Sequence, residues 1–276
     1  MKHLIILLCL AFSLLLTGCP SQKDTPSPQP TEPSKQTQEV QKNADISTAV
    51  SVSPADIPAY TGEAFTVCNG NTPSFTAEEI QRARKGAFEF YSPLDELGRC
   101  GYTVACIGKE IMPTEPRGKI GMIKPSGWKM AKYDIVDGKY LYNRCHLIGF
   151  QLAGENANPK NLITGTRYLN IIGMLPFENQ VADYVKRTGN HVLYAVTPLY
   201  NGKELVARGV RMEAYSLEDN GKLAFHVFCH NVQPGVEINY RNGESRLKGN
   251  ISDSDRKAIE KSIKRHDKKV QKKKQY

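Results

Sequence analysis

Three short stretches predict the central fold of this chain: YLYNRCHLIGF at residues 140–150, NPKNLITGTRYLN at residues 158–170 and MLPFEN at residues 174–179. Lys139 to Leu147 alternates aromatic or apolar residues with polar ones, which predicts a strand. Ile163 and Thr164 favour a second strand. Pro176 stands at a first-turn position of a helix predicted to run to about Arg187. The three stretches therefore predict two strands followed by helical structure.

These three stretches together hold one histidine, several carboxamides, one carboxylate and two arginines. A histidine with a near-neutral pKa suits proton abstraction. Amide oxygens together with water suit a hard cation such as Mg²⁺, and arginines suit phosphate oxygens. Each signal is weak alone, because asparagines in a loop are usually turn formers. Together they are the groups that metal-assisted phosphodiester hydrolysis needs.

The spacing of these residues resembles the DNA/RNA non-specific endonuclease family, the ββα-metal (His-Me finger) nucleases. The resemblance is to the surface and DNA-entry nucleases of Gram-positive bacteria. The family signature is Asp-Arg-Gly-His, then an Asn-rich stretch ending in a metal-ligand Asn, then a Glu eight residues later. The matching positions here are Arg144, His146, Asn161, Asn170 and Glu178. The similarity covers about residues 90–245, so it is far more specific than a lone short motif.

The resemblance implies a local fold, a hairpin with His146 on one strand and residues 161–165 on the other. A helix starting near Thr166 would then carry Asn170. Periodicity agrees, because nine residues at 100° each would put Asn161 and Asn170 on opposite faces of one continuous helix. Asn161 is therefore expected on a strand or loop.

The resemblance also implies roles. His146 would be the general base that activates water, and Asn170 the direct ligand of a single Mg²⁺, with Mn²⁺ as a substitute. Glu178 would orient water on the metal, and Asn161 would position His146 or the phosphate. Arg144 completes the set of catalytic candidates. The expected products carry 5′-phosphates.

Some positions depart from the family pattern. Asn143 replaces the usual Asp and Cys145 the usual Gly, and neither is needed as base or ligand, so activity is expected to survive. Ala182 stands where some members place an arginine after the Glu. The phosphate-binding cation must then come from elsewhere: Arg144 or Arg167, with Lys186 as a further candidate.

The flanking sequence predicts an α+β domain, an antiparallel β-sheet flanked by helices with the ββα-metal motif embedded in it. Thr76 to Glu79 is a capping box that opens a helix through about Lys85. Short turns such as Asn201-Gly202 separate later strands, which implies antiparallel neighbours. Those predicted strands are His191–Leu199, Glu204–Leu217, Leu223–Val232 and Val236–Arg241.

The first residues predict export. An apolar run from Leu4 to Leu16 is too short for a stable membrane span and ends in Leu-Thr-Gly-Cys, which resembles a bacterial lipobox. Residues 1–18 are thus expected to be a signal peptide, with Cys19 lipidated; the alternative is an ordinary secretory signal. Residues 19–58 are rich in Pro, Ser and Gln and predict a disordered tether. The expected location is extracytoplasmic, on the cell membrane through Cys19.

Cysteines and charge add further expectations. Five cysteines remain after the anchor, an odd number, so at least one thiol is unpaired: Cys68, Cys100, Cys106, Cys145 and Cys229. The net charge is +9, but residues 252–276 hold ten Lys or Arg against four Asp or Glu. This basic tail is separate from the nuclease domain predicted at residues 59–251, and it reads as a solvated helix or a frayed arm.

Two functions compete. The first is a sequence-nonspecific nuclease of the cell surface, acting on DNA and on RNA. The second is a non-catalytic surface lipoprotein that binds DNA or other polyanions. Persistence of His146, Asn170 and Glu178 favours the first. No sequence feature points to a protein partner. Trp128 is expected as a core or turn anchor rather than a base-stacking platform, and His191 as a packing or solvent-facing residue.

Overall fold

The protein is represented by a computed structural model that describes residues 56–274, with side chains through residue 264. All of them belong to one contact unit, residues 46–276. The predicted signal peptide, Cys19 and nearly all of the tether lie outside the described residues.

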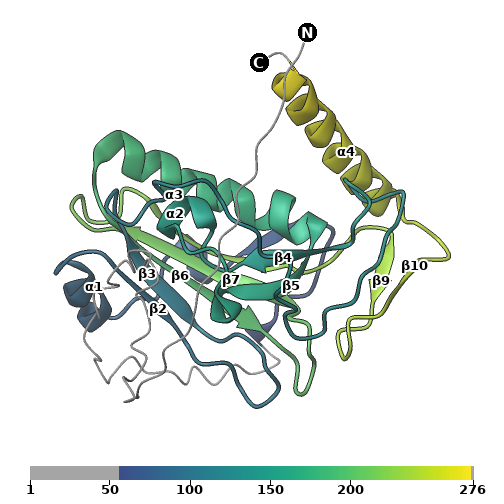
Figure 1. Cartoon of the computed structure of the whole chain (residues 1–276), viewed down its shortest axis with the longest axis horizontal. Coiled ribbons are helices and arrows are strands. Elements are labelled where there is room, and N and C mark those ends of the chain that lie inside the picture. Colours follow the sequence, from purple (N-terminus) through teal and green to yellow (C-terminus); the bar gives the residue numbers. More distant parts are fainter. Residues whose placement is uncertain (1–55, 275–276) are drawn as a thin grey trace, which may run out of the picture. The chain divides into compact units, whose positions relative to one another are not determined.

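The described chain forms both helices and strands, with consecutive runs of strands such as β6 to β10, as expected of an α+β fold (Figure 1). The strands are β1 (Phe65–Val67), β2 (Phe88–Tyr91), β3 (Thr103–Ile107), β4 (Tyr142–His146), β5 (Leu162–Thr166), β6 (Val192–Leu199), β7 (Gly209–Ser216), β8 (Ala224–His230), β9 (Val236–Ile238) and β10 (Ser245–Leu247). The helices are η2 (Asn69–Asn71), α1 (Ala77–Ala83), α2 (Phe150–Ala153), η3 (Pro159–Asn161), η4 (Leu169–Met174), α3 (Leu175–Thr188) and α4 (Asp253–Lys274).

The main sheet is six-stranded in the order β1-β8-β7-β6-β3-β2, and its neighbours pair antiparallel. The predicted antiparallel arrangement of the later strands is therefore confirmed. Two smaller antiparallel pairs, β4-β5 and β9-β10, stand apart from this sheet. The predicted α+β class with an antiparallel sheet and flanking helices is thus correct.

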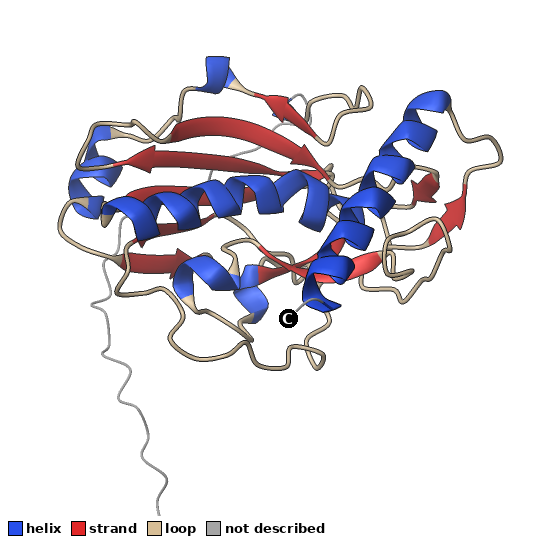
Figure 2. Cartoon of the chain, turned by 90° about the horizontal axis from the view of Figure 1, so that it is seen from above, coloured by secondary structure: helices blue, strands red, loops and turns tan. Residues whose placement is uncertain are grey.

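Helices cover both faces of the six-stranded sheet. Helix α3 lies across one face (Figure 2), where Phe177, Val181 and Val185 pack into the largest buried apolar cluster. On the other face, Ala83 of α1 packs against Val104 of β3 in a second cluster. The capping box predicted at the start of α1 is present, since Glu79 N donates to Thr76 Oγ1 at 3.2 Å. Burial on both faces fixes the sheet as a rigid base for the hairpin β4-β5.

The predicted strand Lys139–Leu147 is shorter at both ends, because β4 runs only from Tyr142 to His146. Gly138 and Lys139 both take left-handed backbone angles, with φ of 70° and 66°. This turn reverses the chain, so Tyr133 N donates to Lys139 O at 2.9 Å and Leu141 N to Ala131 O at 3.0 Å. Residues 139–141 therefore pair with residues 131–133, whereas β4 itself pairs with β5.

Helix α4 is more than a solvated arm, because one face of its first half is docked. Asp255, Ala258 and Ser262 are buried, and Asp255 pairs with Lys248 Nζ at 2.8 Å. Ala258 packs in a cluster that includes Tyr168 and the partly buried Ile172 of η4. Within the described part of the chain, no helix is long and apolar enough to cross a membrane.

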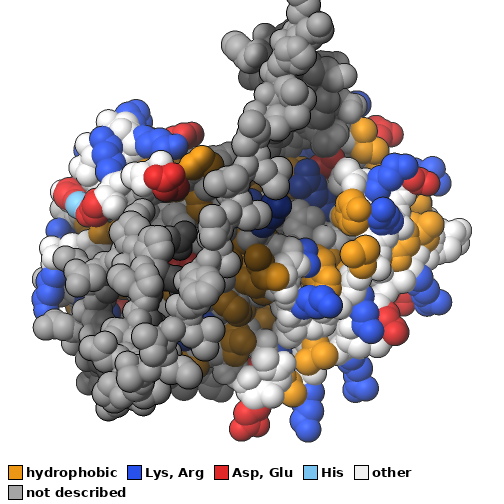
Figure 3. Space-filling view, in the orientation of Figure 1, with side chains coloured by type: hydrophobic (Ala, Val, Ile, Leu, Met, Phe, Trp, Pro, Cys, Tyr) orange, Lys and Arg blue, Asp and Glu red, His pale blue; other side chains and the backbone are white. Residues whose placement is uncertain are grey.

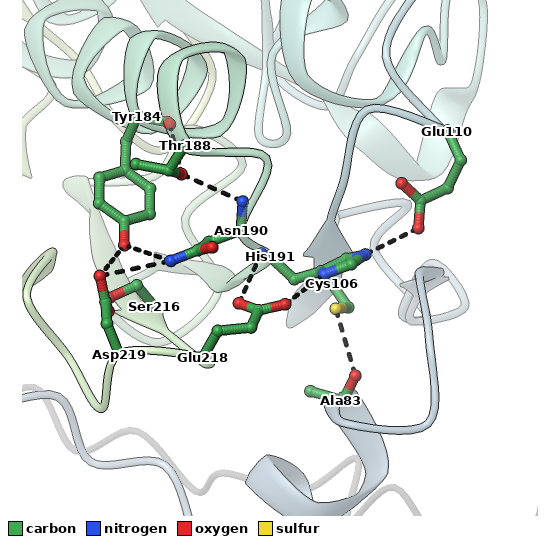
Figure 4. Close-up of polar contacts among 10 residues, drawn as sticks. All are labelled: Ala83, Cys106, Glu110, Tyr184, Thr188, Asn190, His191, Ser216, Glu218 and Asp219. Atoms are coloured by element: carbon green, nitrogen blue, oxygen red, sulfur yellow. Dashed lines mark hydrogen bonds and ion pairs between the residues drawn. The ribbon is translucent and has the colours of Figure 1, made fainter.

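A polar network ties the C-terminal end of α3 to the sheet (Figure 4). Tyr184 Oη donates to Asp219, and Asn190 Nδ2 contacts the Tyr184 hydroxyl at 3.1 Å. Beside it, the His191 ring lies between two carboxylates, with Nδ1 2.6 Å from Glu218 and Nε2 2.8 Å from Glu110. Both carboxylates raise the pKa of His191 against the opposing effect of burial. His191 is therefore a structural ion-pair centre.

Candidate active site

The hairpin β4-β5 and the helices after it place the predicted site residues in order. His146 ends β4 and pairs in register with Leu162, the first residue of β5. Asn161 ends the short helix η3 just before β5. Asn170 follows on η4, a π-helix, and Glu178 lies in the first turn of α3. The predicted strand-strand-helix arrangement is confirmed, although the wider π-helical turn was not anticipated.

The His146 ring is held by two hydrogen bonds, one from its Nε2 to a backbone carbonyl oxygen and one to its Nδ1 from an arginine. Its Nε2 lies 2.8 Å from the Asn156 carbonyl oxygen, which can only accept, so Nε2 carries the proton. Its Nδ1 lies 3.2 Å from Arg117 Nη2, a donor, so Nδ1 presents its lone pair. Burial and, to a smaller extent, Arg117 lower the pKa of His146 to about 4, against the opposing effect of the hydrogen bond to Asn156. The imidazole is therefore a neutral base at ordinary pH.

Arg117 is a residue that sequence reasoning missed. It lies in an exposed loop and lines the same cavity as His146. The signal was present, since residues 116–133 hold five basic residues and no acidic one. The chain-wide charge count hid this local excess because it treated residues 59–251 as one segment.

Glu178 is a carboxylate placed deep in the cavity wall. Its side chain is buried, and burial raises its pKa to about 7. Gly149 makes room for it, because a Cβ at Gly149 would stand 2.7 Å from Glu178 Oε2. The absence of a side chain at Gly149 is thus a requirement for the position of this carboxylate.

Asn170 has its amide orientation set by Asn143. The Asn170 Nδ2 donates to Asn143 Oδ1 at 2.9 Å, so the oxygen of the Asn170 amide is the atom left to bind a ligand in the cavity that both residues line. Arg167 Nη1 also reaches Asn143 Oδ1 at 3.4 Å, and Arg167 Nε donates to Asp137 at 3.0 Å. Asn143 therefore has an orienting role, which the sequence comparison with the family's Asp did not suggest.

The donor chemistry of this cavity fits a hard divalent cation. Asn170 supplies an amide oxygen and Glu178 a carboxylate, and both line one cavity with His146. Across the part of the chain that the structure describes, no three His, Cys, Asp or Glu side chains gather as a metal cluster. Few protein oxygens and room for water are what Mg²⁺ accepts, whereas soft or tetrahedral sites need sulfur or several imidazoles.

The cavity itself is large, with a volume of about 640 Å³. Its lining includes the four polar side chains just described, together with Asn143 and Arg167. It also includes apolar and aromatic side chains, among them Ile120, Trp128, Met130 and Tyr140. A cavity of this size suits a ligand far larger than a phosphate and its water.

Arg144 is placed differently from the phosphate ligand expected. Its Nε donates to the Ile123 carbonyl and its Nη2 to the Gly121 carbonyl at 2.7 Å. The guanidinium also lies 4.2 Å from the centre of the Trp128 ring. Arg144 therefore fastens the basic loop to β4, and Arg167 and Arg117 are better placed to reach a phosphate in the cavity.

Asn161 and Lys186 do not reach the cavity. Asn161 is fully buried, and its amide accepts from Ile148 N at 2.8 Å and donates to Ile148 O at 3.0 Å. It fixes the backbone just after His146, which agrees with the expectation that it positions His146 and gives it no route to a phosphate in the cavity. Lys186 is exposed near the far end of α3, two turns beyond Glu178, so it is not a phosphate ligand inside the cavity.

The cysteines make no disulfide, since all five are free thiols within the described residues. Cys145, which replaces the family's glycine, is buried with its Sγ 3.5 Å from Met174 Sδ. Gly165, two residues beyond the β5 partner of Cys145, has no Cβ, and a Cβ there would stand 2.6 Å from Cys145 Cβ. This pairing explains in steric terms how the hairpin accepts a cysteine.

Comparison with known proteins gives a consistent family. A family model described as DNA/RNA non-specific endonuclease matches residues 78–217. A deoxyribonuclease of Streptococcus dysgalactiae subsp. equisimilis is 33% identical over 135 residues, which make up 45% of this chain and 40% of that protein. The match thus spans well under half the length of that relative.

Solved structures share the fold. NucA from Streptococcus agalactiae with a magnesium ion bound has a TM-score of 0.60 at 26% identity, covering 69% of this chain and 89% of that one. Sda1 nuclease with a bound zinc ion has a TM-score of 0.56 at 25% identity, covering 69% of this chain and 98% of that one. The architecture described above is therefore that of ββα-metal nucleases.

Proposed function

The chain belongs to the DNA/RNA non-specific endonuclease family, and from this premise we propose that it hydrolyses phosphodiester bonds in DNA and RNA with Mg²⁺ as cofactor. Mn²⁺ is expected to substitute. The observation that carries the proposal is the orientation of His146. Its Nε2 donates a hydrogen bond to the Asn156 carbonyl oxygen, so Nδ1 carries the lone pair. That lone pair accepts from Arg117, which lines the same cavity as His146, Asn170 and Glu178.

In the proposed reaction, His146 Nδ1 takes a proton from the water that attacks phosphorus. The P–O3′ bond breaks, the leaving O3′ takes a proton from solvent to become a 3′-hydroxyl, and the other product strand carries a 5′-phosphate. The imidazolium so formed still donates its Nε2 hydrogen bond to the Asn156 carbonyl oxygen, and this bond stabilises the added positive charge. The imidazolium then releases the Nδ1 proton to solvent. Because the pKa of His146 lies near 4, the base is unprotonated across the neutral range.

Arg117 has to leave His146 when substrate binds. The guanidinium of Arg117 occupies the position from which a water molecule would hydrogen-bond to Nδ1, and the two cannot be there together. A phosphate in the cavity offers the guanidinium a stronger, charge-assisted partner. We infer that Arg117 moves from His146 to the phosphate and there stabilises the charge that develops on its oxygens.

Asn170 would ligate the divalent cation directly and Glu178 would orient water on it; when bound, the cation supplies positive charge to the phosphate and to the leaving oxygen. Asn143 accepts from the Asn170 amide nitrogen and so sets the amide with its oxygen available as a ligand. Arg167, fixed by Asp137, adds a second phosphate-binding cation to the same cavity. The relatives are consistent with such a cofactor, since solved NucA holds magnesium and solved Sda1 holds zinc.

We further propose that the nuclease domain, residues 59–251, acts outside the cytoplasm at the cell membrane. The apolar run ending in Leu-Thr-Gly-Cys supports removal of residues 1–18 and lipidation of Cys19, and residues 19–58 would be the tether. The mature protein should partition into a detergent phase. A Cys19→Ser variant that still partitions in this way would contradict the anchor.

The direct test is digestion of plasmid DNA and of a folded RNA by the purified protein with Mg²⁺, with Mn²⁺ and with EDTA. We expect His146→Ala to reduce cleavage by about 10²- to 10⁴-fold. His191→Gln is the matched control, because this histidine lies in the carboxylate cluster of Figure 4 and not in the cavity. Thermal unfolding of both variants verifies that they are folded.

Unchanged cleavage by folded His146→Ala would overturn the assignment of His146 and with it the mechanism. Wild-type protein that retards DNA on a gel without shortening it would instead revive the non-catalytic polyanion-binding lipoprotein. Cleavage that persists in EDTA would contradict the divalent cofactor.

A further inference from the structure

The apolar residues that line part of the active-site cavity have no role in the mechanism above. We define the apolar lip as Ile120, Trp128, Met130 and Tyr140, which all line the cavity that contains His146. Met130 is 74% exposed and Tyr140 is 48% exposed. Large apolar side chains exposed together beside a polar site usually mark a binding surface.

The backbone presents Tyr140 outward by a specific turn. Gly138 and Lys139 take left-handed angles, and an antiparallel bridge then sets Lys132 opposite Tyr140. As a result, Lys132 Nζ lies 4.6 Å from the centre of the Tyr140 ring. A half-exposed aromatic ring with a cation against it combines a flat surface with a positive charge.

Trp128 is the member of the apolar lip that is anchored in the core. It packs with the buried Leu141, Tyr142 and Val236, and the Arg144 guanidinium covers its ring. Trp128 is thus partly a core anchor, as its sequence context suggested. Tyr140 and Met130 are the members of the lip that remain open to a ligand.

The charge around the lip identifies the class of ligand. Residues 116–133 carry five basic residues and no acidic one. Figure 3 shows hydrophobic side chains lying among Lys and Arg on the part of this face that is not covered by grey atoms. A second cavity offers a contrast, because it is lined by ion pairs such as Glu204–Arg208 and Glu237–Arg246. Flat apolar surface combined with positive charge fits a polyanion that also has flat apolar faces.

We propose that the apolar lip binds an unpaired nucleobase next to the phosphodiester that is cut at His146. The site thereby favours single-stranded stretches of nucleic acid over duplex; this rests on the proposed function. In a duplex the base faces are stacked on one another, and only the backbone and the groove edges are accessible. In a single strand, each base can lay its face on an aromatic ring or a methionine, whatever its sequence. The lip therefore adds affinity without sequence specificity.

The test compares kcat/KM on one labelled DNA oligonucleotide offered single-stranded and as a blunt duplex. Tyr140→Ala should lower the ratio of single-strand to duplex kcat/KM by at least about five-fold, the smaller end of what base–aromatic stacking contributes. Tyr140→Phe, which keeps the ring, should restore the wild-type ratio. Met122→Ala is the matched control, because Met122 is 69% exposed in the same loop yet does not line the cavity.

A second measurement uses inhibitors rather than substrates. A nucleoside 5′-monophosphate should inhibit the wild-type enzyme more strongly than inorganic phosphate does, and Tyr140→Ala should remove that difference. An unchanged single-strand to duplex ratio in Tyr140→Ala, or an equal loss in Tyr140→Phe, overturns the proposal. Absence of metal-dependent cleavage by the wild type would instead overturn the proposed function itself, so the two failures are distinguishable.

Discussion

Two histidines at opposite ends of α3 show how surroundings decide what one side chain does. Near the first turn of α3, His146 meets a carbonyl at Nε2 and a guanidinium at Nδ1. Beyond the last turn, His191 meets a carboxylate at each nitrogen. Burial and a cation lower the pKa of His146, whereas two anions raise the pKa of His191.

The difference is one of available lone pairs. Bridging two carboxylates requires both ring nitrogens to carry protons, so His191 is stabilised as imidazolium and can accept nothing. His146 has one proton held and one lone pair directed at the cavity, which is the state of a base. Both residues are histidines beside polar loops, so only the partners distinguish a catalytic candidate from a structural ion pair.

Removing the cation beside His146 is the sharpest way to break this comparison. Arg117→Ala should lower kcat by about 10²-fold, because a guanidinium on the phosphate stabilises the transition state. It should also raise the pKa of His146, since Arg117 contributes to its lowering. On lowering the pH, the variant should therefore begin to lose activity at a higher pH than the wild type does. Lys119→Ala is the control, since Lys119 is exposed in the same loop outside the cavity; an equal loss there would refute a specific role for Arg117.

The carboxylates near the two histidines differ as well. Burial raises the pKa of Glu178 to about 7, so a proton competes with the cation below that pH. Titration calorimetry with MgCl₂ should show that the affinity for Mg²⁺ falls about ten-fold per pH unit below pH 7. This slope is expected because one proton on Glu178 must be displaced for each cation that binds. Glu178→Gln should bind Mg²⁺ more weakly and with little pH dependence. Glu110→Gln, in the His191 cluster, should leave binding unchanged; a pH-independent wild type would contradict this account.

The His191 cluster should be visible in stability rather than in activity. A histidine whose folded pKa is raised stabilises the fold below its unfolded value of about 6.5, and this stabilisation is lost as pH rises through the folded value. Urea unfolding at pH 5.5 and pH 9 should show a decline of about 0.5 kcal/mol that His191→Gln lacks. A variant that keeps the wild-type pH dependence would show that other groups cause it.

The smallest expected effect concerns the basic tail, far from both histidines in sequence. Deleting residues 265–276 removes six Lys or Arg and one Asp. We expect DNA binding at low salt to weaken a few-fold and its salt dependence to diminish, with kcat unchanged. Deleting residues 252–276 instead would remove the buried Ala258 and disturb η4. A lower kcat in the shorter deletion would contradict a purely electrostatic role.

Much of this site could be predicted from the sequence because its key residues occur in a short, ordered segment. His146, Asn170 and Glu178 lie within one strand-strand-helix unit, so local spacing and family resemblance sufficed to gather them in one cavity. The antiparallel sheet followed from β-rich segments separated by short turns. Both are properties of neighbouring residues along the chain.

The remaining features depend on contacts between distant segments. Arg117 is 29 residues from His146 in sequence yet touches it, and no local pattern announces such a contact. Asn161 was expected to position His146 or the phosphate, and the fold buries it with its amide bonded to the backbone of Ile148. Arg144 was expected on phosphate, whereas loop carbonyls compete for its donors. Long polar side chains have several possible partners, and only the folded chain selects one.

The docking of α4 on η4 has a consequence for the order of folding. Tyr168, the N-cap of η4, and Ile172 within η4 are synthesised before Ala258, which packs in the same cluster and is added only after residues 175–252 have been made. Until then Tyr168 and Ile172 lack this packing partner, although Asn170 stands between them in sequence. The segment that carries the metal-ligand candidate therefore completes its packing only when the C-terminal helix has docked.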